Sequence, residues 1–201
     1  MAEHEDEEEV SPAEDLIREH GALKRVLLAY GESIRRLDAN QELAPEAIAD
    51  AATIIRTFIE DYHERLEDDQ LFPRFRKANV HVDLVDVLLA QHQAGRRVTE
   101  ETLALANLQS IRSPQDRRRL TESLRTFIRM YEPHEASEDT VLFPALRKIV
   151  TPHEYDALGE EFEKIEHRKF GDGGFAEMVD RVVAIEKTLG IYDLAQFTPQ
   201  G

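Results

Sequence analysis

Two stretches of the chain carry residues that can bind metal, at the same spacing. HERLEDDQLFP runs from His63 to Pro73, and HEASEDTVLFP runs from His134 to Pro144. Each begins with a histidine that lies four residues before a glutamate. On a helix such a pair lies on one face, about one turn apart, so that an imidazole and a carboxylate can hold the same ion. The repeat therefore predicts metal chemistry in two related places.

A second, weaker repeat lies upstream of each stretch. HGALKRV begins at His20 and HQAGRRV begins at His92; the interval from His20 to His63 is 43 residues, and that from His92 to His134 is 42. We interpret the chain as two copies of a helical hairpin. Packed about a pseudo-twofold axis, the two copies would turn six side chains inward at similar depth: His20, His63, Glu67, His92, His134 and Glu138.

The donor types narrow the choice of metal. Four imidazoles and two carboxylates, without sulfur, suit a pair of first-row transition ions such as iron, manganese or zinc better than calcium or magnesium. The alternative is structural, because a lone core histidine is more often hydrogen-bonded than a ligand, and an isolated HxxxE pair is more often a solvated ion pair. The metal hypothesis depends on the coincidence of all six residues in one repeat.

Hydrophobic periodicity predicts the helices that would position these residues. The first begins at Ser11, where Ser-Pro-Ala-Glu forms a capping-box pattern, and its apolar seam has steps of three and four. Further helices are expected from about Pro45, Asp83 and Ser113. Short loops between four long helices predict an all-α, antiparallel up-down-up-down four-helix bundle over residues 11–150. The repeated LFP is expected to supply core contacts, with a proline that kinks or ends the helix.

The two ends of the chain differ from the bundle. Residues 1–10 hold six acidic side chains and no periodicity, which predicts a disordered acidic tail. Residues 151–201 predict a C-terminal helical extension, with helices over 151–170 and 175–189 separated by GDGG. Fifty residues bury little on their own, so we expect the extension to pack on the bundle.

Composition excludes several classes of function. The chain of 201 residues has no cysteine, which removes thiolate nucleophiles, disulfides and iron–sulfur clusters. A formal net charge of −16 disfavours binding to nucleic acid or to anionic membranes. No apolar run reaches the roughly 20 residues that span a bilayer, and the acidic N-terminus is unlike a secretory signal. We expect a cytoplasmic protein with no nucleic-acid or membrane partner.

The pattern of His20, His63-xxx-Glu67, His92 and His134-xxx-Glu138 on four successive helices resembles the hemerythrin family, specifically its HHE cation-binding members. The resemblance covers about residues 13–148. It implies two non-haem iron ions with an oxo or hydroxo bridge, which manganese or zinc could replace. Carried over, Glu67 and Glu138 would bridge the ions and the four histidines would be terminal ligands. A ferritin-like alternative needs two ExxH motifs, and only Glu60 to His63 fits that pattern.

The chain departs from oxygen-carrying hemerythrins, which have a second histidine one turn away on the third helix and an aspartate five residues after the fourth-helix histidine. Here Leu88 and Arg96 lie one turn either side of His92, and we take Glu138 as the fourth-helix carboxylate. One ligand is therefore missing, which leaves more positions for water, peroxide or nitric oxide and makes reactive chemistry more plausible.

Neighbouring side chains offer replacements for the missing ligand or support for the others. Each of the second- and fourth-helix histidines has a tyrosine shortly before it and a glutamate directly after it; the four residues are Tyr62, Glu64, Tyr131 and Glu135. A phenolate can bind ferric iron, whereas the two glutamates are expected at the surface or behind the ligands. His81, His153 and His167 have no repeated partner and are expected at the surface.

The function that follows is a di-iron protein that binds or senses oxygen, peroxide, nitric oxide or iron. One alternative is a di-iron redox enzyme of peroxide or nitric oxide detoxification, and another is iron buffering. Whether the chain is an enzyme, and which residues would then be catalytic, stays open. The expected partner is a small diatomic ligand or peroxide, and the extension offers a surface for a homodimer or a protein partner.

Overall fold

A computed structural model describes residues 10–199, and within that range the chain is helical with no strands. The acidic tail expected at residues 1–10 lies outside the described residues, except for Val10. In chain order the segments are α1 (Pro12–Asp38), α2 (Pro45–Ile54), η1 (Ile55–His63), α3 (Glu64–Leu66), η2 (Glu67–Leu71), α4 (Phe72–Ala78), α5 (Val82–Leu105), α6 (Leu108–Arg112), α7 (Pro114–Ser137), η3 (Glu138–Leu142), α8 (Phe143–Ile149), α9 (Pro152–Phe170), η4 (Gly171–Gly173), α10 (Gly174–Thr188) and η5 (Leu194–Phe197).

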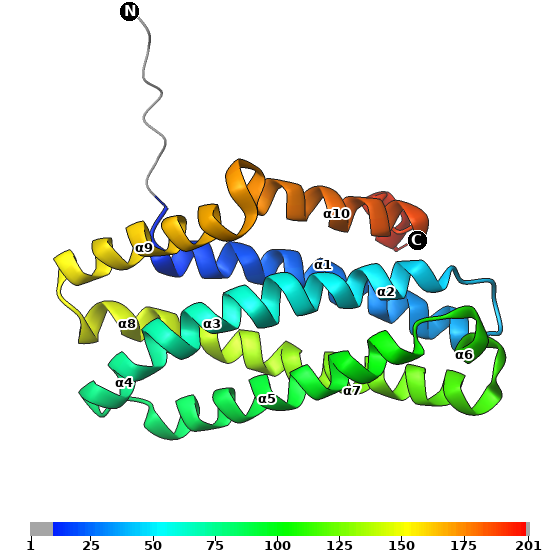
Figure 1. Cartoon of the computed structure of the whole chain (residues 1–201), viewed down its shortest axis with the longest axis horizontal. Helices are drawn as coiled ribbons and strands as arrows, with labels where there is room; N and C mark the ends of the chain where they lie inside the picture. The colour runs from blue at the N-terminus through cyan, green and yellow to red at the C-terminus, as the bar shows by residue number, and fades with distance from the viewer. Residues whose placement is uncertain (1–9, 200–201) are drawn as a thin grey trace, which may run out of the picture.

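Four long rods form an antiparallel bundle (Figure 1). The first is α1, the second runs without interruption from α2 to α4, the third is α5, and the fourth runs from α7 to α8. Helix α1 lies against the second rod and α7, α5 lies against the same two rods, and the second and fourth rods meet each other through α4 and α8. The prediction of an all-α bundle with a C-terminal helical extension is confirmed.

Three of the predicted helix starts are built by side-chain caps. Ser11 and Thr151 each form a capping box. The hydroxyl of the cap residue accepts a hydrogen bond from the backbone N–H of a glutamate three residues later, and the side chain of that glutamate accepts one from the backbone N–H of the cap residue. Ser113 caps α7 by accepting from the backbone N–H of Asp116. Each of the three helices has proline in its first turn, where the missing N–H leaves no bond unmade.

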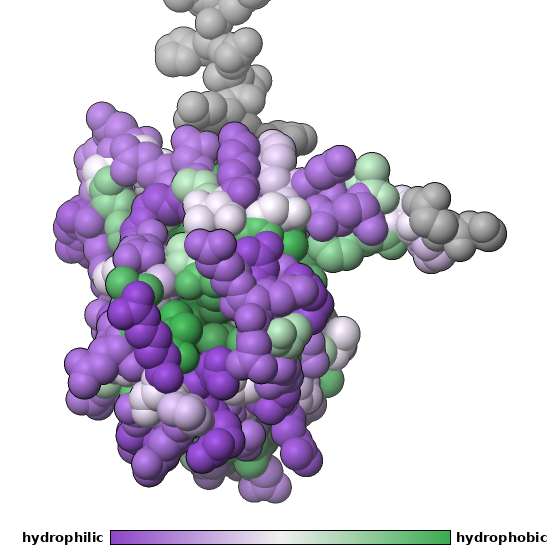
Figure 2. Space-filling view, turned by 90° about the vertical axis from the view of Figure 1, so that its right-hand side faces the viewer, coloured by the Kyte–Doolittle hydropathy of each residue, from purple (hydrophilic) through white to green (hydrophobic). Residues whose placement is uncertain are grey.

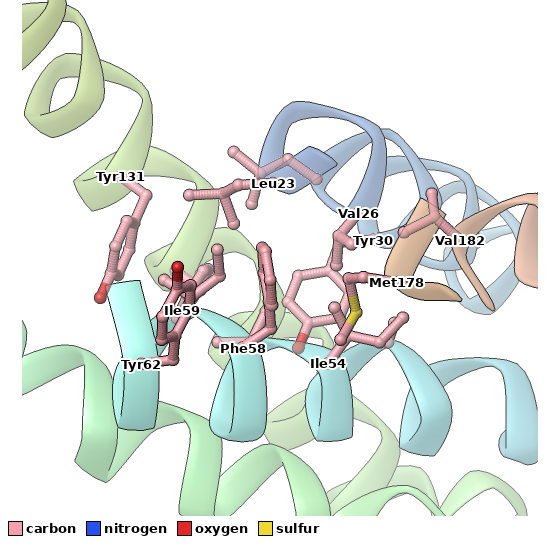
Figure 3. Close-up of a cluster of buried hydrophobic side chains, with 14 of the residues drawn as sticks. Leu23, Val26, Tyr30, Ile54, Phe58, Ile59, Tyr62, Tyr131, Met178 and Val182 are labelled. Atoms are coloured by element: carbon pink, nitrogen blue, oxygen red, sulfur yellow. The ribbon is translucent and has the colours of Figure 1, made fainter. Parts of the chain in front are cut away.

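Aliphatic and aromatic side chains from every rod fill the interior on both sides of the polar residues. Leu23, Tyr30, Phe58 and Phe127 are all at most 1% exposed, and the rings of Tyr30 and Phe127 meet edge to face at 5.8 Å. Figure 3 shows this cluster reaching from α1 to Met178 and Val182 of α10. The extension therefore shares the core of the bundle.

Both repeated motifs lie where the helix widens into π-helical turns. Segments η2 and η3 begin at the motif glutamates and end directly before Phe72-Pro73 and Phe143-Pro144. Proline cannot donate a backbone hydrogen bond, and its ring clashes with the carbonyl four residues earlier in a regular α-helix. A wider turn accommodates the ring, and such turns are frequent at functional sites. Contrary to one expectation, the helix does not end at either proline.

Helices α9 and α10 lie along one side of the bundle, where they contact α1, and α10 also contacts α2. Phe170 at the end of α9 meets the ring of Tyr62 edge-on at 5.2 Å, and Phe175 lies 6.1 Å from the ring of Phe58. Figure 2, viewed toward the end of the bundle that holds α6, shows a mostly hydrophilic surface with hydrophobic residues in a central hollow. Among the described helices, none is long and apolar enough to cross a membrane.

Candidate metal centre

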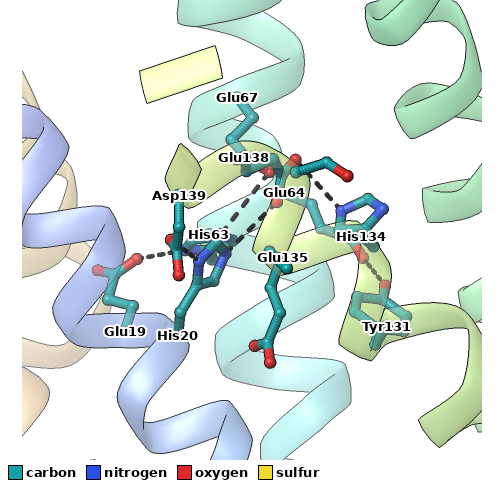
Figure 4. A network of polar contacts seen from close by, with 12 residues as sticks. Glu19, His20, His63, Glu64, Glu67, Tyr131, His134, Glu135, Glu138 and Asp139 are labelled. Atoms are coloured by element: carbon teal, nitrogen blue, oxygen red, sulfur yellow. Dashed lines mark hydrogen bonds and ion pairs between the residues drawn. The ribbon is translucent and has the colours of Figure 1, made fainter. Parts of the chain in front are cut away.

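The six repeat residues lie together at the centre of the bundle. His20 comes from α1, His63 and Glu67 from the second rod, His92 from α5, and His134 and Glu138 from the fourth rod. None of the six is more than 3% exposed. Figure 4 shows the two carboxylates between imidazoles that approach from different helices. The pseudo-twofold packing expected from the repeat thus places all six side chains in one buried cluster.

The cluster divides into two overlapping groups that could each hold an ion. One consists of His20, His63, Glu67 and Glu138, and the other of Glu67, His92, His134 and Glu138; within each group the ligand atoms lie within 4.8 Å of one another. Glu67 Oε2 lies 3.7 Å from His63 Nε2 and 3.4 Å from His92 Nε2. Glu138 faces His20 with Oε2, at 3.5 Å, and His134 with Oε1, at 3.2 Å. Both carboxylates belong to both groups, which is the arrangement of a binuclear site.

The unpaired atoms of the cluster fit a pair of cations. Both oxygens of Glu67, both oxygens of Glu138 and Nε2 of His63 are buried without a hydrogen-bond partner among the described residues. His92 Nε2 and His134 Nε2 face each other at 3.2 Å. Two ligands at about 2.1 Å from one ion are roughly 3.0–3.4 Å apart at common coordination angles, so these spacings suit atoms that share an ion. Unpaired buried polar atoms are otherwise destabilising.

Every imidazole of the cluster is oriented through its other nitrogen. His20 Nδ1 lies 2.7 Å from Asp139, His63 Nδ1 lies 2.6 Å from Glu19, His92 Nδ1 lies 2.9 Å from Asp68, and His134 Nδ1 lies 2.9 Å from the amide oxygen of Gln91. An acceptor at Nδ1 keeps the proton there and leaves the Nε2 lone pair for a metal. All four Nε2 atoms therefore face the centre of the cluster with a lone pair that could bind a metal ion.

Burial sets the protonation of the ligands before any ion binds. It lowers the pKa of His20 to about 4 and that of His134 to about 3, because the charged imidazolium is poorly solvated there. Burial also raises the pKa of Glu67 and of Glu138 well above the usual range for a glutamate. Burial therefore favours the neutral imidazole of His20 and of His134 and the protonated carboxyl group of Glu67 and of Glu138, and a cation that bound there would displace the carboxyl protons.

A second buried network lies beside His134. Tyr131, whose ring is centred 5.1 Å from that of His134, donates a hydrogen bond to Glu64 Oε1. Glu64 Oε2 accepts a hydrogen bond of 2.7 Å from Arg96, which also lies 3.4 Å from Asp61 at the surface. Burial raises the pKa of both Glu64 and Tyr131. A phenol, a carboxyl group and a guanidinium therefore connect the cluster to the exterior; Figure 4 shows the first two, Tyr131 and Glu64, beside His134.

The remaining residues singled out from the sequence occupy different surroundings. Tyr62 is buried against Phe170, and burial and the adjacent Glu19 raise its pKa. Glu135 is buried with Lys24 3.8 Å away. Neither Glu64 nor Glu135 lies at the surface, and a role behind the ligands stays a prediction for both. As expected, the three unrepeated histidines are exposed: His81, His153 and His167.

The four histidine partners were missed at the sequence level, although the repeat contains two of them. Asp68 and Asp139 directly follow the motif glutamates, so they are part of both repeated phrases. Asp139 also occupies the position five residues after His134 that was treated as replaced by Glu138; its side chain turns to His20. Of the two positions one turn from His92, Leu88 is buried and Arg96 turns away toward Glu64.

Comparison with known proteins adds to this geometry. The family described as "Hemerythrin HHE cation binding domain" matches residues 11–146. Uncharacterized protein Rv1995 of Mycobacterium tuberculosis (strain H37Rv) and uncharacterized protein Mb2018 of Mycobacterium bovis are each 49% identical to this chain over 195 residues, which is 97% of this chain and 76% of the relative. No solved structure matches significantly. The match to the family covers all four rods of the bundle and all six clustered residues.

Proposed function

The chain belongs to the hemerythrin HHE cation-binding domain family, and from that premise we propose that it binds two iron ions and through them binds or senses oxygen, peroxide or nitric oxide. One observation carries the proposal: Glu67 and Glu138 lie in both ligand groups, and their four oxygens are buried with no hydrogen-bond partner in the described part of the chain. Carboxylates and imidazoles without sulfur suit iron, while manganese or zinc could occupy the same donors.

The residues of this chain would bind the two ions and orient the imidazoles that hold them. His20 and His63 would hold one ion, His92 and His134 the other, and the two glutamates would bridge them. The partners at Nδ1 hold each imidazole in the tautomer that presents Nε2. Two bound irons supply open positions for a small ligand and a reversible change of oxidation state. The apolar rings beside the cluster, including Phe72 and Phe143, exclude bulk water.

Metal analysis tests the proposal directly. Protein reconstituted with ferrous iron without oxygen should hold about two irons per chain, and His63→Ala combined with His134→Ala should remove most of that iron. The matched control replaces His81 and His167 with alanine, because both are exposed and lie outside the cluster. Fewer than two irons per chain in the unaltered protein, or equal loading of the two double variants, would contradict the proposal.

Tyr131 favours a second candidate, a redox enzyme that removes peroxide or nitric oxide. Its hydroxyl is buried beside His134 and donates to Glu64, so the proton on Oη is held next to the ligands. Hydrogen peroxide added to the iron-loaded protein separates the candidates. Sustained oxygen release that falls in Tyr131→Phe supports the enzyme. Oxidation of about one equivalent without turnover supports the binding or sensing protein, and iron that exchanges freely with a chelator supports buffering.

A further inference from the structure

A groove with a volume of about 670 Å³ lies along the seam between α1 and α7, next to the end of the C-terminal extension. Its lining is mainly apolar, and the apolar residues that contribute to it are Leu27, Leu28, Ile128, Ile191 and Phe197. Leu28 and Phe197 are each 53% exposed, so the groove is open to solvent. Apolar hollows on a mostly hydrophilic surface are candidate ligand sites. None of the six clustered residues lines this groove.

One end of the groove, its inner end, lies next to the cluster. The lining there includes Lys24, one turn after His20, and Glu135, directly after His134. Lys24 Nζ lies 3.8 Å from Glu135 Oε1 and 3.3 Å from Asp139 Oδ2. Asp139 Oδ1 in turn lies 2.7 Å from Nδ1 of His20. Two side-chain contacts therefore lead from the groove to a histidine of the cluster.

The inner end of the groove is loosely closed. Glu135 is 2% exposed, yet its Oε2 has no hydrogen-bond partner in the described part of the chain. Figure 4 shows its side chain extending away from Glu67 and Glu138. Lys24 is half-exposed, and its contacts with Glu135 and Asp139 are at or beyond the long end of hydrogen-bond distances. Exposed side chains change rotamer within nanoseconds, so Lys24 does not seal the groove permanently.

Other sides of the cluster are tightly packed. The rings of Phe143 and Phe72 stack on imidazoles of the cluster, with centroids 5.6 Å apart in both pairs. On the side of Tyr131, even a Cβ at Gly95 would lie only 2.7 Å from the phenol oxygen. Close packing thus leaves an approach open along the groove and closes it on these sides.

We propose that the groove is the route by which a small uncharged diatomic molecule, such as dioxygen or nitric oxide, reaches the cluster. The inference rests on the proposed function, because it requires a metal-loaded cluster that takes such a ligand. An uncharged diatomic molecule gives up little hydration between apolar walls, whereas an ion would give up much more. Because Ile191 and Phe197 line the groove, the C-terminal extension takes part in ligand access.

Filling the groove tests the route. Gly31 of α1 lines it, and a Cβ at Gly31 would meet nothing within 4 Å, so Gly31→Trp can occupy the groove without displacing its neighbours. Stopped-flow mixing of the ferrous protein with nitric oxide under argon measures binding, and a scavenger measures release. Both rate constants should fall on the order of tenfold, which corresponds to a rise of about 1.4 kcal/mol in the barrier to passage. A route affects entry and exit alike, so Kd should not change.

A second measurement needs no metal. Crystals of the metal-free protein pressurised with xenon should show xenon between Leu28 and Ile128, because apolar cavities bind this gas. Crystals of Gly31→Trp should show none there. This result reports the apolar groove itself, independently of any reaction at the cluster.

Matched variants on α1 separate the groove from the helix. Gly21→Trp is the control, because Gly21 is also exposed, a Cβ there would also meet nothing within 4 Å, and it lies outside the groove although it is next to a clustered histidine. It should bind and release nitric oxide at the unaltered rates. Leu28→Trp is a second filling variant, and Ile17→Trp, at another exposed apolar position of α1, is its control.

The outcomes distinguish the route from the site. The inference is overturned, while two irons still bind, if the unaltered protein does not bind nitric oxide, if its groove takes no xenon, or if both filling variants keep the unaltered rates. Slower binding with unchanged release would indicate a damaged site and would also overturn it. Fewer than two irons per unaltered chain would instead overturn the proposed function.

Discussion

Replacing Glu67 and Glu138 together with methionine should stabilise the metal-free protein and abolish its stabilisation by metal. Their four oxygens have no hydrogen-bond partner within residues 10–199, and both residues are 0% exposed. Methionine is similar in length and adaptable in shape, so it can fill the same volume without polar atoms. Changing both residues matters, because removing one carboxyl group alone leaves the other beside fewer polar atoms.

The expected size follows from the number of groups removed. A buried polar group without a partner destabilises a protein by about 1–3 kcal/mol, so two carboxyl groups correspond to about 2–6 kcal/mol. For this chain of 201 residues, about 1 kcal/mol shifts the melting temperature by about 2–4 °C, so the metal-free variant should melt on the order of 10 °C higher. Each metal at 1,000 times its Kd stabilises the unaltered protein by about 4.1 kcal/mol, so two metals contribute about 8 kcal/mol. That exceeds the expected gain of the variant, so metal should reverse the order of stability.

Thermal unfolding followed by circular dichroism, with and without ferrous iron under argon, measures both effects. Glu60→Met is the matched control, because Glu60 is also 0% exposed and its oxygens also lack a hydrogen bond among the described residues, but its Oε2 forms an ion pair of 2.9 Å with the cationic Arg56. That variant should lose stability in both conditions and keep its response to iron. The reasoning is refuted if the double variant melts below the unaltered protein without metal, or if it keeps the shift produced by iron.

Three further predictions follow from the same structure. Metal binding should release protons and tighten as pH rises, because the two bridging carboxyl groups have raised pKa values; calorimetry in buffers of different ionisation enthalpy counts the protons, and identical heats would contradict this. Burial and the nearby Glu19 raise the pKa of Asp15 to about 7 in the folded state, from 3.8, so the folded protein binds the extra proton and loses stability as pH rises from about 4 to 7. Asp15→Asn removes this loss, so its gain in urea-unfolding free energy over the unaltered protein should grow across that window; a constant difference would refute it. A Cβ at Gly95 would lie 2.7 Å from Tyr131 Oη, so Gly95→Ala should destabilise by about 1–3 kcal/mol, whereas Gly31→Ala, with nothing within 4 Å, should be neutral or stabilising in the same melts.

The bundle was predictable because its signals are local and repeated. Caps at Ser11, Ser113 and Thr151 fix where helices begin, and the apolar seams fix which faces turn inward. The one-turn helix α6 was not predicted, since five residues carry no periodicity and its cap, Asn107, resembles any loop asparagine. The π-helical turns were not predicted either. The prolines indicate that a regular α-helix is disturbed, but they do not indicate whether the helix kinks, ends or widens.

Only those residues of the cluster that belong to the repeat could be predicted from the sequence. The repeat marked the six residues that the structure brings together, and their role as metal ligands stays a prediction. The contact between Tyr131 and Glu64 could not be read from the sequence. It joins residues 67 positions apart, and the approach of α5 to α7 that allows it depends on the missing side chain of Gly95. Such contacts arise from packing between rods, which no spacing along one helix encodes.

A duplicated ligand set does not imply two equivalent ions. The repeat reproduces the donors and their aspartate partners, since both halves of the pseudo-twofold arrangement need them. Among the described residues the surroundings are not duplicated, because Phe170 of the extension lies against Tyr62 on the side that holds Glu19, and Tyr131 lies beside His134 and donates to Glu64. One side of the cluster therefore has a carboxyl partner for its imidazole beneath the extension, while the other has an amide partner and a buried phenol. Any ligand that binds across both positions would meet two chemically different ends, and that difference comes from residues outside the repeat.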